Sequence, residues 1–273
     1  MTGRIQPIQP VQRLVLEPPS RGRSFRAVTV NRVRIILDRI LHRPPKSRLV
    51  ERNVDRAARE ILNLPPNEFD SLWDEACRSR LEERIARQLH LRFPSGPPVL
   101  LIASPEGDWL EILRLLYVLV RATRPMHVVE TGVGPVGAST TFILQAMHAN
   151  AAGHLWSLDA GHYLSRYGVE PGNGIPDDLR DRHTLLIAET RGQLVRVLDQ
   201  CVPPAEIFLH DSEHTFANMT FEFGAAWPRL SVGGYLLSDD ARNSAPDRFA
   251  TRVGLKPKFI MYGGTPFGVL RKP

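Results

Sequence analysis

The chain has 273 residues, a net charge of +6, and 42% hydrophobic and 23% charged residues, an ordinary composition for a globular protein. This length accommodates one α/β domain and an accessory segment. No apolar run approaches the roughly 20 residues of a membrane span. The Pro- and Arg-rich N-terminal residues lack a continuous apolar stretch of the signal-peptide type. Two cysteines exclude a disulfide framework and a four-cysteine metal site. We therefore expect a cytoplasmic protein without a membrane partner.

The positive charge is concentrated at the N-terminus. Residues 1–50 contain 11 Lys and Arg but only two acidic residues, so they carry +9 and the remainder of the chain carries −3. A basic segment can bind an anionic partner. However, Phe25 is its only aromatic residue, and no nucleic-acid-binding module follows. We expect residues 1–24 to form an irregular basic arm, and we consider nucleic-acid binding the less favoured role for it.

Residues 25–103 show helical spacing and predict a helical cap or a contact between subunits. One helix is predicted from Val33 to the prolines at 44–45, a second over residues 54–63, and a third from a cap at Asn67 to about His90. The third helix carries an apolar stripe that must be buried, either on its own domain or on a second subunit. A homo-oligomer formed through these helices is therefore expected. The stripe consists of Phe69, Leu72, Trp73, Ala76, Leu81, Ile85 and Leu89.

From residue 104 onwards, short apolar runs alternate with helical segments. Ser104 and Pro105 are suited to start a helix that continues through the apolar residues 110–120. Strands separated by helices predict βαβ units and a mostly parallel sheet. The last two strands are too closely spaced for a helical crossover and should form an antiparallel hairpin. The predicted strands are 126–131, 153–158, 183–188, 205–210, 234–239, 257–262 and 266–271, and the predicted helices after the first strand are 138–149, 190–200, 215–227 and 244–252.

The most informative motif is the segment 128–140, VVETGVGPVGAST. Its apolar run ends in Glu130, and Gly132, Gly134 and Gly137 then lead into a helical segment. Glycines allow close approach of a ligand to the backbone, and the free N–H groups of a helix start favour anionic ligand groups. The spacing also fits the dinucleotide fingerprint GxGxxG, which is weak by itself. Glu130 lies at the end of the strand, where its carboxylate is expected to face the ligand crevice.

Acidic residues follow four of the other predicted strands. Asp159 ends the second strand, about twenty residues beyond the glycine loop, where a carboxylate can hold a ribose diol. Glu189 follows the third strand, Asp211 the fourth, and Asp239 with Asp240 the fifth. Parallel sheets bind ligands at the carboxyl ends of their strands. Because neighbouring like charges cost free energy unless a cation or ligand offsets them, this joint arrangement predicts a site.

Residues 104–272 resemble class I S-adenosylmethionine-dependent methyltransferases, especially the branch of small-molecule O-methyltransferases that act on sugars and natural products. The resemblance rests on the glycine loop together with GHLWSLDA, FLHDSEHTFANMTFEF and AAWPRLSVGGYLLSDD. It implies a methyltransferase domain over residues 104–273 with a Rossmann-like, seven-stranded, mostly parallel sheet and a C-terminal antiparallel hairpin. The implied function is methyl transfer to a hydroxyl of a small metabolite.

The resemblance also implies residue roles. The methionine part of S-adenosylmethionine would lie among Glu130 and the glycines at 132, 134 and 137, with Ser139 and Thr140 near its carboxylate. Asp159 would hold the ribose, and Glu189 would border the adenine. Asp211 belongs to the cofactor side as well as to the metal site described next.

Catechol-type relatives hold a divalent metal on an aspartate after strand four and on an Asp-Asn pair after strand five, and they use a lysine base. The corresponding residues here are Asp211, Asp239 and Asp240, an all-aspartate set that fits Mg²⁺. His214 occupies the position of the lysine. It is the first candidate for the base, and Glu213 is the second.

Two other functions stay open from sequence. A nicotinamide-dependent oxidoreductase would share the glycine loop, but the chain lacks a visible Tyr-x-x-x-Lys set, and that function would not explain the aspartates. A non-catalytic nucleoside-binding protein would retain only the cofactor site. Residues 160–180 are long for a strand connection and are a candidate for a mobile cover over the pocket. The sequence does not identify the methyl acceptor.

Overall fold

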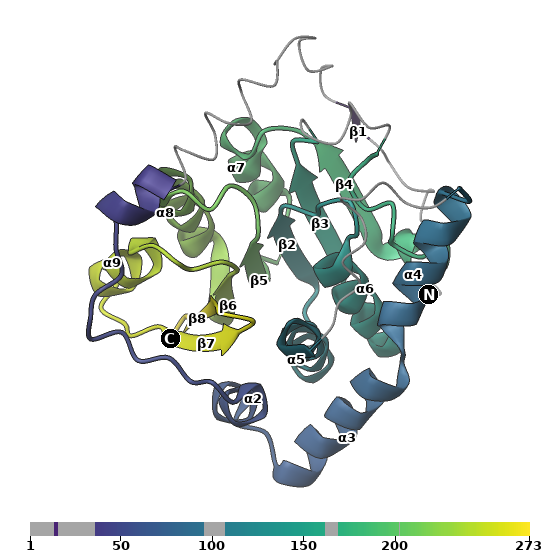
Figure 1. The fold of residues 1–273 in the computed structure, drawn as a ribbon, viewed down its shortest axis with the longest axis horizontal. Coiled ribbons are helices and arrows are strands. Elements are labelled where there is room, and N and C mark those ends of the chain that lie inside the picture. The colour runs from purple at the N-terminus through teal and green to yellow at the C-terminus, as the bar shows by residue number, and fades with distance from the viewer. Residues whose placement is uncertain (1–13, 16–35, 96–106, 162–168, 202) are drawn as a thin grey trace, which may run out of the picture.

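The computed structural model describes residues 14–15, 36–95, 107–161, 169–201 and 203–273. Its centre is a sheet with the strand order β1-β4-β3-β2-β5-β6-β8-β7, covered by helices on both faces (Figure 1). The strands are β1 (Leu14–Val15), β2 (His127–Thr131), β3 (His154–Asp159), β4 (His183–Ile187), β5 (Ala205–His210), β6 (Leu230–Ser238), β7 (Lys258–Tyr262) and β8 (Thr265–Arg271).

The seven predicted strands are all present. β2 to β6 pair in parallel, and β8 pairs antiparallel with both β6 and β7. This confirms the seven-stranded, mostly parallel Rossmann-like sheet with its C-terminal hairpin. Gly263 and Gly264 form the hairpin turn with φ values of +47° and +78°, as a two-residue turn with positive φ at both positions requires. The two-residue β1 adds to the outer side of β4 in parallel.

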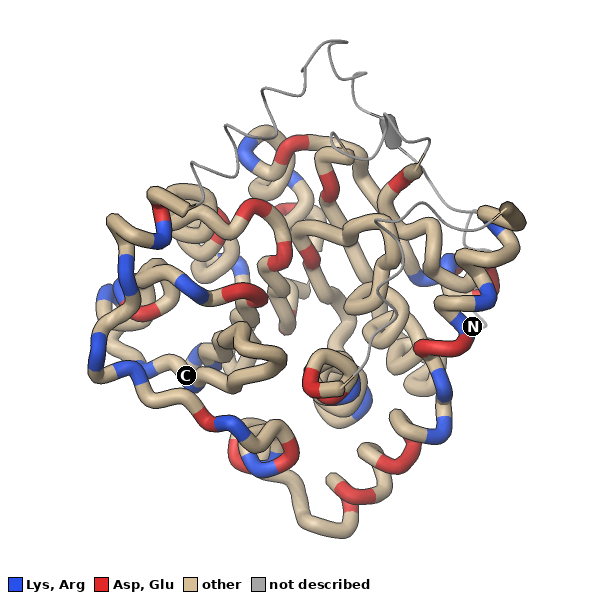
Figure 2. Tube along the Cα trace, viewed as in Figure 1, with Lys and Arg blue, Asp and Glu red and all other residues tan. Residues whose placement is uncertain are grey.

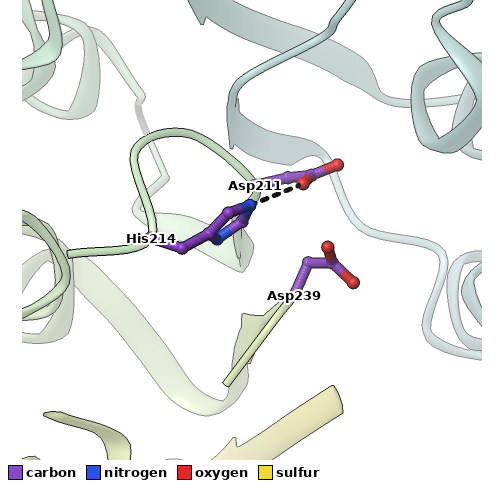
Figure 3. Close-up of side chains that lie close together, drawn as sticks. All are labelled: Asp211, His214 and Asp239. Atoms are coloured by element: carbon purple, nitrogen blue, oxygen red, sulfur yellow. Dashed lines mark ion pairs between the residues drawn. The ribbon is translucent and has the colours of Figure 1, made fainter. Parts of the chain in front are cut away.

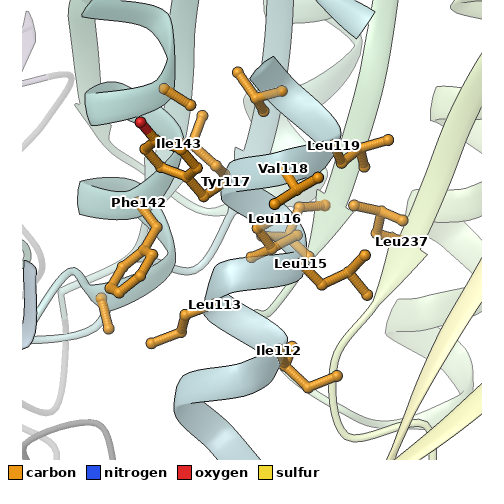
Figure 4. Close-up of a cluster of buried hydrophobic side chains, with 14 of the residues drawn as sticks. Ile112, Leu113, Leu115, Leu116, Tyr117, Val118, Leu119, Phe142, Ile143 and Leu237 are labelled. Atoms are coloured by element: carbon orange, nitrogen blue, oxygen red, sulfur yellow. The ribbon is translucent and has the colours of Figure 1, made fainter. Parts of the chain in front are cut away.

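Two helical layers bury opposite faces of the sheet. One face packs against α5 (Gly107–Thr123) and α6 (Ala138–Asn150), and the other packs against α7 (Thr190–Gln200), α8 (Phe216–Ala226) and α9 (Ala245–Arg252). Successive strand residues point to opposite faces, so Val128 belongs to the first core and Val129 to the second. Figure 4 shows the apolar side of α5 in the first core. The predicted start of this helix at residues 104–105 lies outside the described residues.

The N-terminal helices α2 (Val54–Leu62), α3 (Pro66–Arg78) and α4 (Leu81–Arg92) extend the first core. The apolar stripe is buried within the same chain, on α5 and α6. The single helix predicted from Asn67 to about His90 is wrong. The helix breaks at Ser79–Arg80, where Arg80 has φ +47°, and it begins at Pro66, whose preset φ suits a first turn.

Residues 36–52, which we call the N-terminal strap, run along the outer side of α8, α9 and β7 (Figure 1). Residues 36–41 are helical, and the part of the predicted helix before residue 36 lies outside the described residues. The His42 ring stacks on Phe216 with centroids 4.1 Å apart. Arg48 pairs with Asp247, and Glu51 forms a parallel bridge with Ile260 of β7. The strap is therefore fixed to the fold at several points.

None of the described helices combines the length and apolar character needed to cross a bilayer. Cys77 and Cys201 are both free thiols.

Candidate functional site

Acidic residues gather at the carboxyl ends of the central strands. Figure 2 shows them where β2, β3, β5 and β6 end, whereas Lys and Arg are frequent along the strap. The crossover connections of a parallel sheet bring these strand ends to one edge. The sequence therefore places the predicted cofactor and metal residues on the same side of the molecule.

The glycine loop packs directly against the end of β5. Gly132 has φ +85°, and a Cβ at this position would lie 1.9 Å from the carbonyl oxygen of Asp211. The Asp211 amide donates a hydrogen bond to the Thr131 carbonyl oxygen at 2.7 Å. Glycine is thus required at 132 for both its φ angle and this close contact. The loop and Asp211 form one rigid junction.

Asp159 organises the loop from β3. Its Oδ2 accepts hydrogen bonds from the amides of Val133 at 2.9 Å and Gly134 at 3.0 Å, and its Oδ1 accepts one from the Gly161 amide at 2.7 Å. The sequence assigned this residue to a ribose. In the structure, both of its carboxylate oxygens accept hydrogen bonds from backbone amides, and two of these amides belong to the glycine loop.

Glu130 is fully buried and does not face an open crevice, contrary to the prediction. It accepts hydrogen bonds from the hydroxyls of Ser139 at 2.5 Å, Thr140 at 2.7 Å and Ser157 at 2.9 Å. Burial raises the pKa of Glu130 to about 7 despite these three donors. The predicted ligand hydroxyls of Ser139 and Thr140 are therefore directed to Glu130, because a buried carboxylate needs hydrogen-bond donors.

The segment 169–176 covers part of the glycine loop. The Gly172 amide donates to the Gly134 carbonyl oxygen at 2.8 Å, and a Cβ on Gly137 would lie 2.5 Å from Cγ1 of Ile175. Gly137 thus packs against the segment 169–176. The remaining predicted cover includes residues 162–168, which lie outside the described residues. Glu189 is exposed and precedes α7 as its N-cap residue.

Asp211, His214 and Asp239 form a compact cluster at the ends of β5 and β6 (Figure 3). One potential ligand atom from each lies within 4.8 Å of the others. His214 Nε2 is 3.7 Å from Asp211 Oδ1, and His214 Nδ1 is buried without a hydrogen-bond partner. Two carboxylates and an imidazole are a donor set suited to a divalent cation.

The electrostatics of this cluster are unfavourable without a counter-charge. Burial, followed by the nearby Asp239 and Glu130, raises the pKa of Asp211 well above its usual value. Burial also raises the pKa of Asp239, although the Tyr262 hydroxyl donates a hydrogen bond to it. Burial and the adjacent His210 lower the pKa of His214 to about 3. His214 is therefore a neutral imidazole at pH 7.

Asp240 lies outside the cluster of Asp211, His214 and Asp239. It pairs with Arg39 of the strap at 2.5 Å and with Arg242 at 2.6 Å. Two of the three aspartates predicted for the metal therefore come together, while the third has arginine partners. Glu213, the second predicted base, has an exposed side chain.

Sequence reasoning missed two residues that support the cluster. Tyr262 lies on β7, which β8 separates from β6, and its hydroxyl donates a hydrogen bond to Asp239. Glu222 of α8 is fully buried and accepts four side-chain hydrogen bonds around the end of β5. The available signal for Glu222 was its position one turn after Asn218 and next to Phe223, on the face of α8 that must be buried.

Residues 129–241 match the family model described as "Methyltransferase domain". This segment contains the glycine loop, Asp159, Asp211 and Asp239. Residues 129–241 form a methyltransferase domain. The match starts within β2 and ends after β6, so the methyltransferase domain as matched includes the strand ends that build the site.

Solved methyltransferases match part of the chain at low identity and with TM-scores below 0.5. The O-methyltransferase TomG of Streptomyces achromogenes, involved in tomaymycin synthesis and solved with its cofactor, is 13% identical, with 70% of this chain and 90% of that chain covered and a TM-score of 0.48. An O-methyltransferase from Bacillus cereus is 16% identical, with 81% and 97% covered and a TM-score of 0.48. A putative O-methyltransferase from Klebsiella pneumoniae is 20% identical, with 70% and 90% covered and the same score. No curated protein matches the chain.

Proposed function

We propose that the chain is an S-adenosylmethionine-dependent O-methyltransferase that acts on a hydroxyl of a small metabolite or natural product with the help of a divalent cation. The observation that carries this proposal is the cluster of Asp211, His214 and Asp239 beside the glycine loop of a methyltransferase domain. Because Gly132 contacts the backbone of Asp211, a methyl donor on the loop would lie next to an acceptor held at the cluster.

The donor set of the cluster fits a divalent cation. Asp211 and Asp239 supply carboxylate oxygens. Burial raises the pKa of each, and for Asp211 the neighbouring Asp239 raises it further, so a bound cation would stabilise both charged carboxylates. The imidazole of His214 is neutral, as a metal ligand requires, and it would supply a nitrogen. With Asp240 paired to Arg39 and Arg242, we place His214 rather than Asp240 in the ligand set. An imidazole also makes Mn²⁺, Fe²⁺ or Zn²⁺ a suitable ion besides Mg²⁺.

The chain's own residues supply binding and alignment. The glycine loop and Asp159 would hold the nucleoside, and the junction at Gly132 would fix the distance between the two substrates. Alignment of this kind lowers the barrier of a displacement by up to roughly 7–11 kcal/mol. A bound divalent cation would lower the pKa of the acceptor hydroxyl. The low pKa of His214 makes it a weak base at neutral pH, so we propose the ligand role for it in place of the base role.

Asp239→Ala tests the proposal. We expect this variant to lose Mn²⁺ binding, measured by electron paramagnetic resonance, and methyl transfer to a panel of hydroxylated acceptors, while its affinity for S-adenosylmethionine in calorimetry stays unchanged. Asp199→Ala is the matched control, because Asp199 is exposed and pairs with Arg229 on the surface. Undiminished Mn²⁺ binding by Asp239→Ala would remove the metal site from the proposal.

The same titrations separate the other functions. Binding of NAD without S-adenosylmethionine would support an oxidoreductase. Nucleoside binding with neither cation binding nor turnover would support a non-catalytic protein. The cytoplasmic location, the assembly through the N-terminal helices and the three-domain division of the chain stay predictions from sequence.

A further inference from the structure

Glu222 collects hydrogen bonds from three parts of the fold. Its Oε2 accepts from Thr131 Oγ1 at 2.5 Å and lies 2.6 Å from His210 Nδ1. Its Oε1 accepts from Ser212 Oγ at 2.6 Å and from Asn218 Nδ2 at 2.9 Å. The residue is 0% exposed and lies in the middle of α8. Burial acts to raise the pKa of Glu222, but His210, followed by Ser212 and Thr131, lowers it to about 2.

The donors flank the residues of the cluster. His210 and Ser212 are the chain neighbours of Asp211, and Thr131 precedes Gly132. Asn218 also donates to the carbonyl oxygen of Glu213 at 3.2 Å, next to His214. One carboxylate therefore holds both sides of Asp211, the start of the glycine loop and the connection that carries His214.

This arrangement has a physical cost that a purely structural residue would not explain. Glu222 places a fully buried carboxylate behind the end of β5, and a buried charge costs free energy unless it is paired and hydrogen-bonded. An apolar side chain would avoid this cost and could fill the same space. A carboxylate with four donors fixes the end of β5 against the mutual repulsion of the two aspartates.

We propose that Glu222 is a positioning residue: it touches neither cation nor substrate, and it holds Asp211 and His214 at the spacing that a divalent cation needs. This inference rests on the proposed function, because the cation is part of that proposal. Groups that orient metal ligands from behind commonly change metal affinity 10- to 100-fold when they are replaced.

Glu222→Gln is the principal test. The amide keeps the size of the side chain but loses the charge and presents N–H groups to donors. We expect Mn²⁺ affinity, measured by electron paramagnetic resonance in the presence of S-adenosylhomocysteine, to fall by about tenfold or more. S-adenosylhomocysteine affinity should fall clearly less, because only the Thr131 hydrogen bond links Glu222 to the start of the glycine loop. Glu75→Gln is the control, because Glu75 accepts hydrogen bonds from Tyr117 and Arg121 far from the cluster. It should lose stability but retain Mn²⁺ affinity.

Ser212→Ala provides a milder second variant if Glu222→Gln does not fold. It removes one hydrogen bond beside Asp211 and leaves the Glu222 carboxylate in place, so we expect a smaller loss of Mn²⁺ affinity without a change in nucleoside affinity. Wild-type Mn²⁺ affinity in a folded Glu222→Gln or Ser212→Ala protein would overturn the positioning role alone. Absence of Mn²⁺ binding by the wild-type chain would overturn the proposed metal site and this inference together.

Discussion

Two groups of carboxylates at the carboxyl ends of the strands have different surroundings. On the side of the glycine loop, Glu130 and Asp159 each accept three hydrogen bonds from the chain. On the side of β5 and β6, Asp211 and Asp239 lie close together with a neutral imidazole. The first half is satisfied by its own donors, as a preformed nucleoside site should be. In the second half, burial raises the pKa of both aspartates, and perturbed pKa values of this kind cluster at functional sites.

Gly132→Ala is expected to have the largest effect on stability and ligand binding, because Gly132 joins the two halves of the site. Gly132→Ala would force a Cβ into the Asp211 carbonyl group and leave alanine at φ +85°. We expect the free energy of unfolding to fall by on the order of 4 kcal/mol, measured by urea denaturation, with loss of both nucleoside and Mn²⁺ binding.

Gly264→Ala is the control for strain alone. Gly264 has φ +78° in the β7–β8 turn and no atom within 4 Å of the built Cβ. This variant should lose about 1 kcal/mol and keep both ligands. Equal losses in the two glycine variants would show that the contact with Asp211 is unimportant.

The pH dependence of stability sharpens the comparison, because Glu130 and Glu222 shift in opposite directions. The pKa of Glu130 is raised to about 7 by burial, so its contribution is fully present below its unfolded pKa of 4.5 and is lost as the pH rises through 7. Because of this group, the free energy of unfolding of the wild-type protein should fall by up to about 3 kcal/mol as the pH rises through this window. Glu130→Gln should not show this fall. Thermal or urea unfolding at pH 4.5 to 8 measures it.

Glu222 should show the opposite trend. Its pKa is lowered to about 2, so its contribution is present above pH 4.5 and is lost as the pH falls toward 2. Replacing Glu222 should therefore flatten the acid side of the stability profile and leave the neutral side sloped. For Glu130, an equal fall in unfolding free energy near neutral pH in wild-type protein and in Glu130→Gln would contradict the raised pKa of this residue.

Arg39→Ala gives the smallest expected effect. Arg39 and Asp240 are partly exposed, so the lost pair should cost no more than about 1 kcal/mol of unfolding free energy. Mn²⁺ affinity should rise slightly, because a positive charge leaves the neighbourhood of Asp239. A clear fall in Mn²⁺ affinity would mean that Arg39 supports the cation site through Asp240.

The strands and the helices between them could be predicted because their apolar runs have clear periods and are separated by turn residues. The strand-end positions of Asp159, Asp211 and Asp239 follow directly from that pattern. The resemblance assigns Asp240 to the metal because it stands where relatives carry the second residue of an Asp-Asn pair, but Arg39, far earlier in the chain, pairs with it. No local pattern reveals such a long-range partner.

Other features were hidden for physical reasons. The break at Arg80 uses a positive φ without glycine, and the packing of α3 on α5 and of α4 on α6 helps to offset its cost. Glu222 resembles a solvent-facing helical residue unless the face of α8 that meets the sheet is known. Glu130 was placed correctly at the end of its strand, but three hydroxyls from α6 and β3 enclose its carboxylate.

The first fifth of the chain borders both outer strands of the sheet. Leu14–Val15 pairs with β4 at one end, and Glu51 bridges β7 at the other. Unpaired strand edges are templates for association with other chains. Truncation before residue 52 would therefore expose backbone hydrogen-bonding groups of β4 and β7, at the two ends of the sheet. The shortened protein should be prone to aggregate through strand addition.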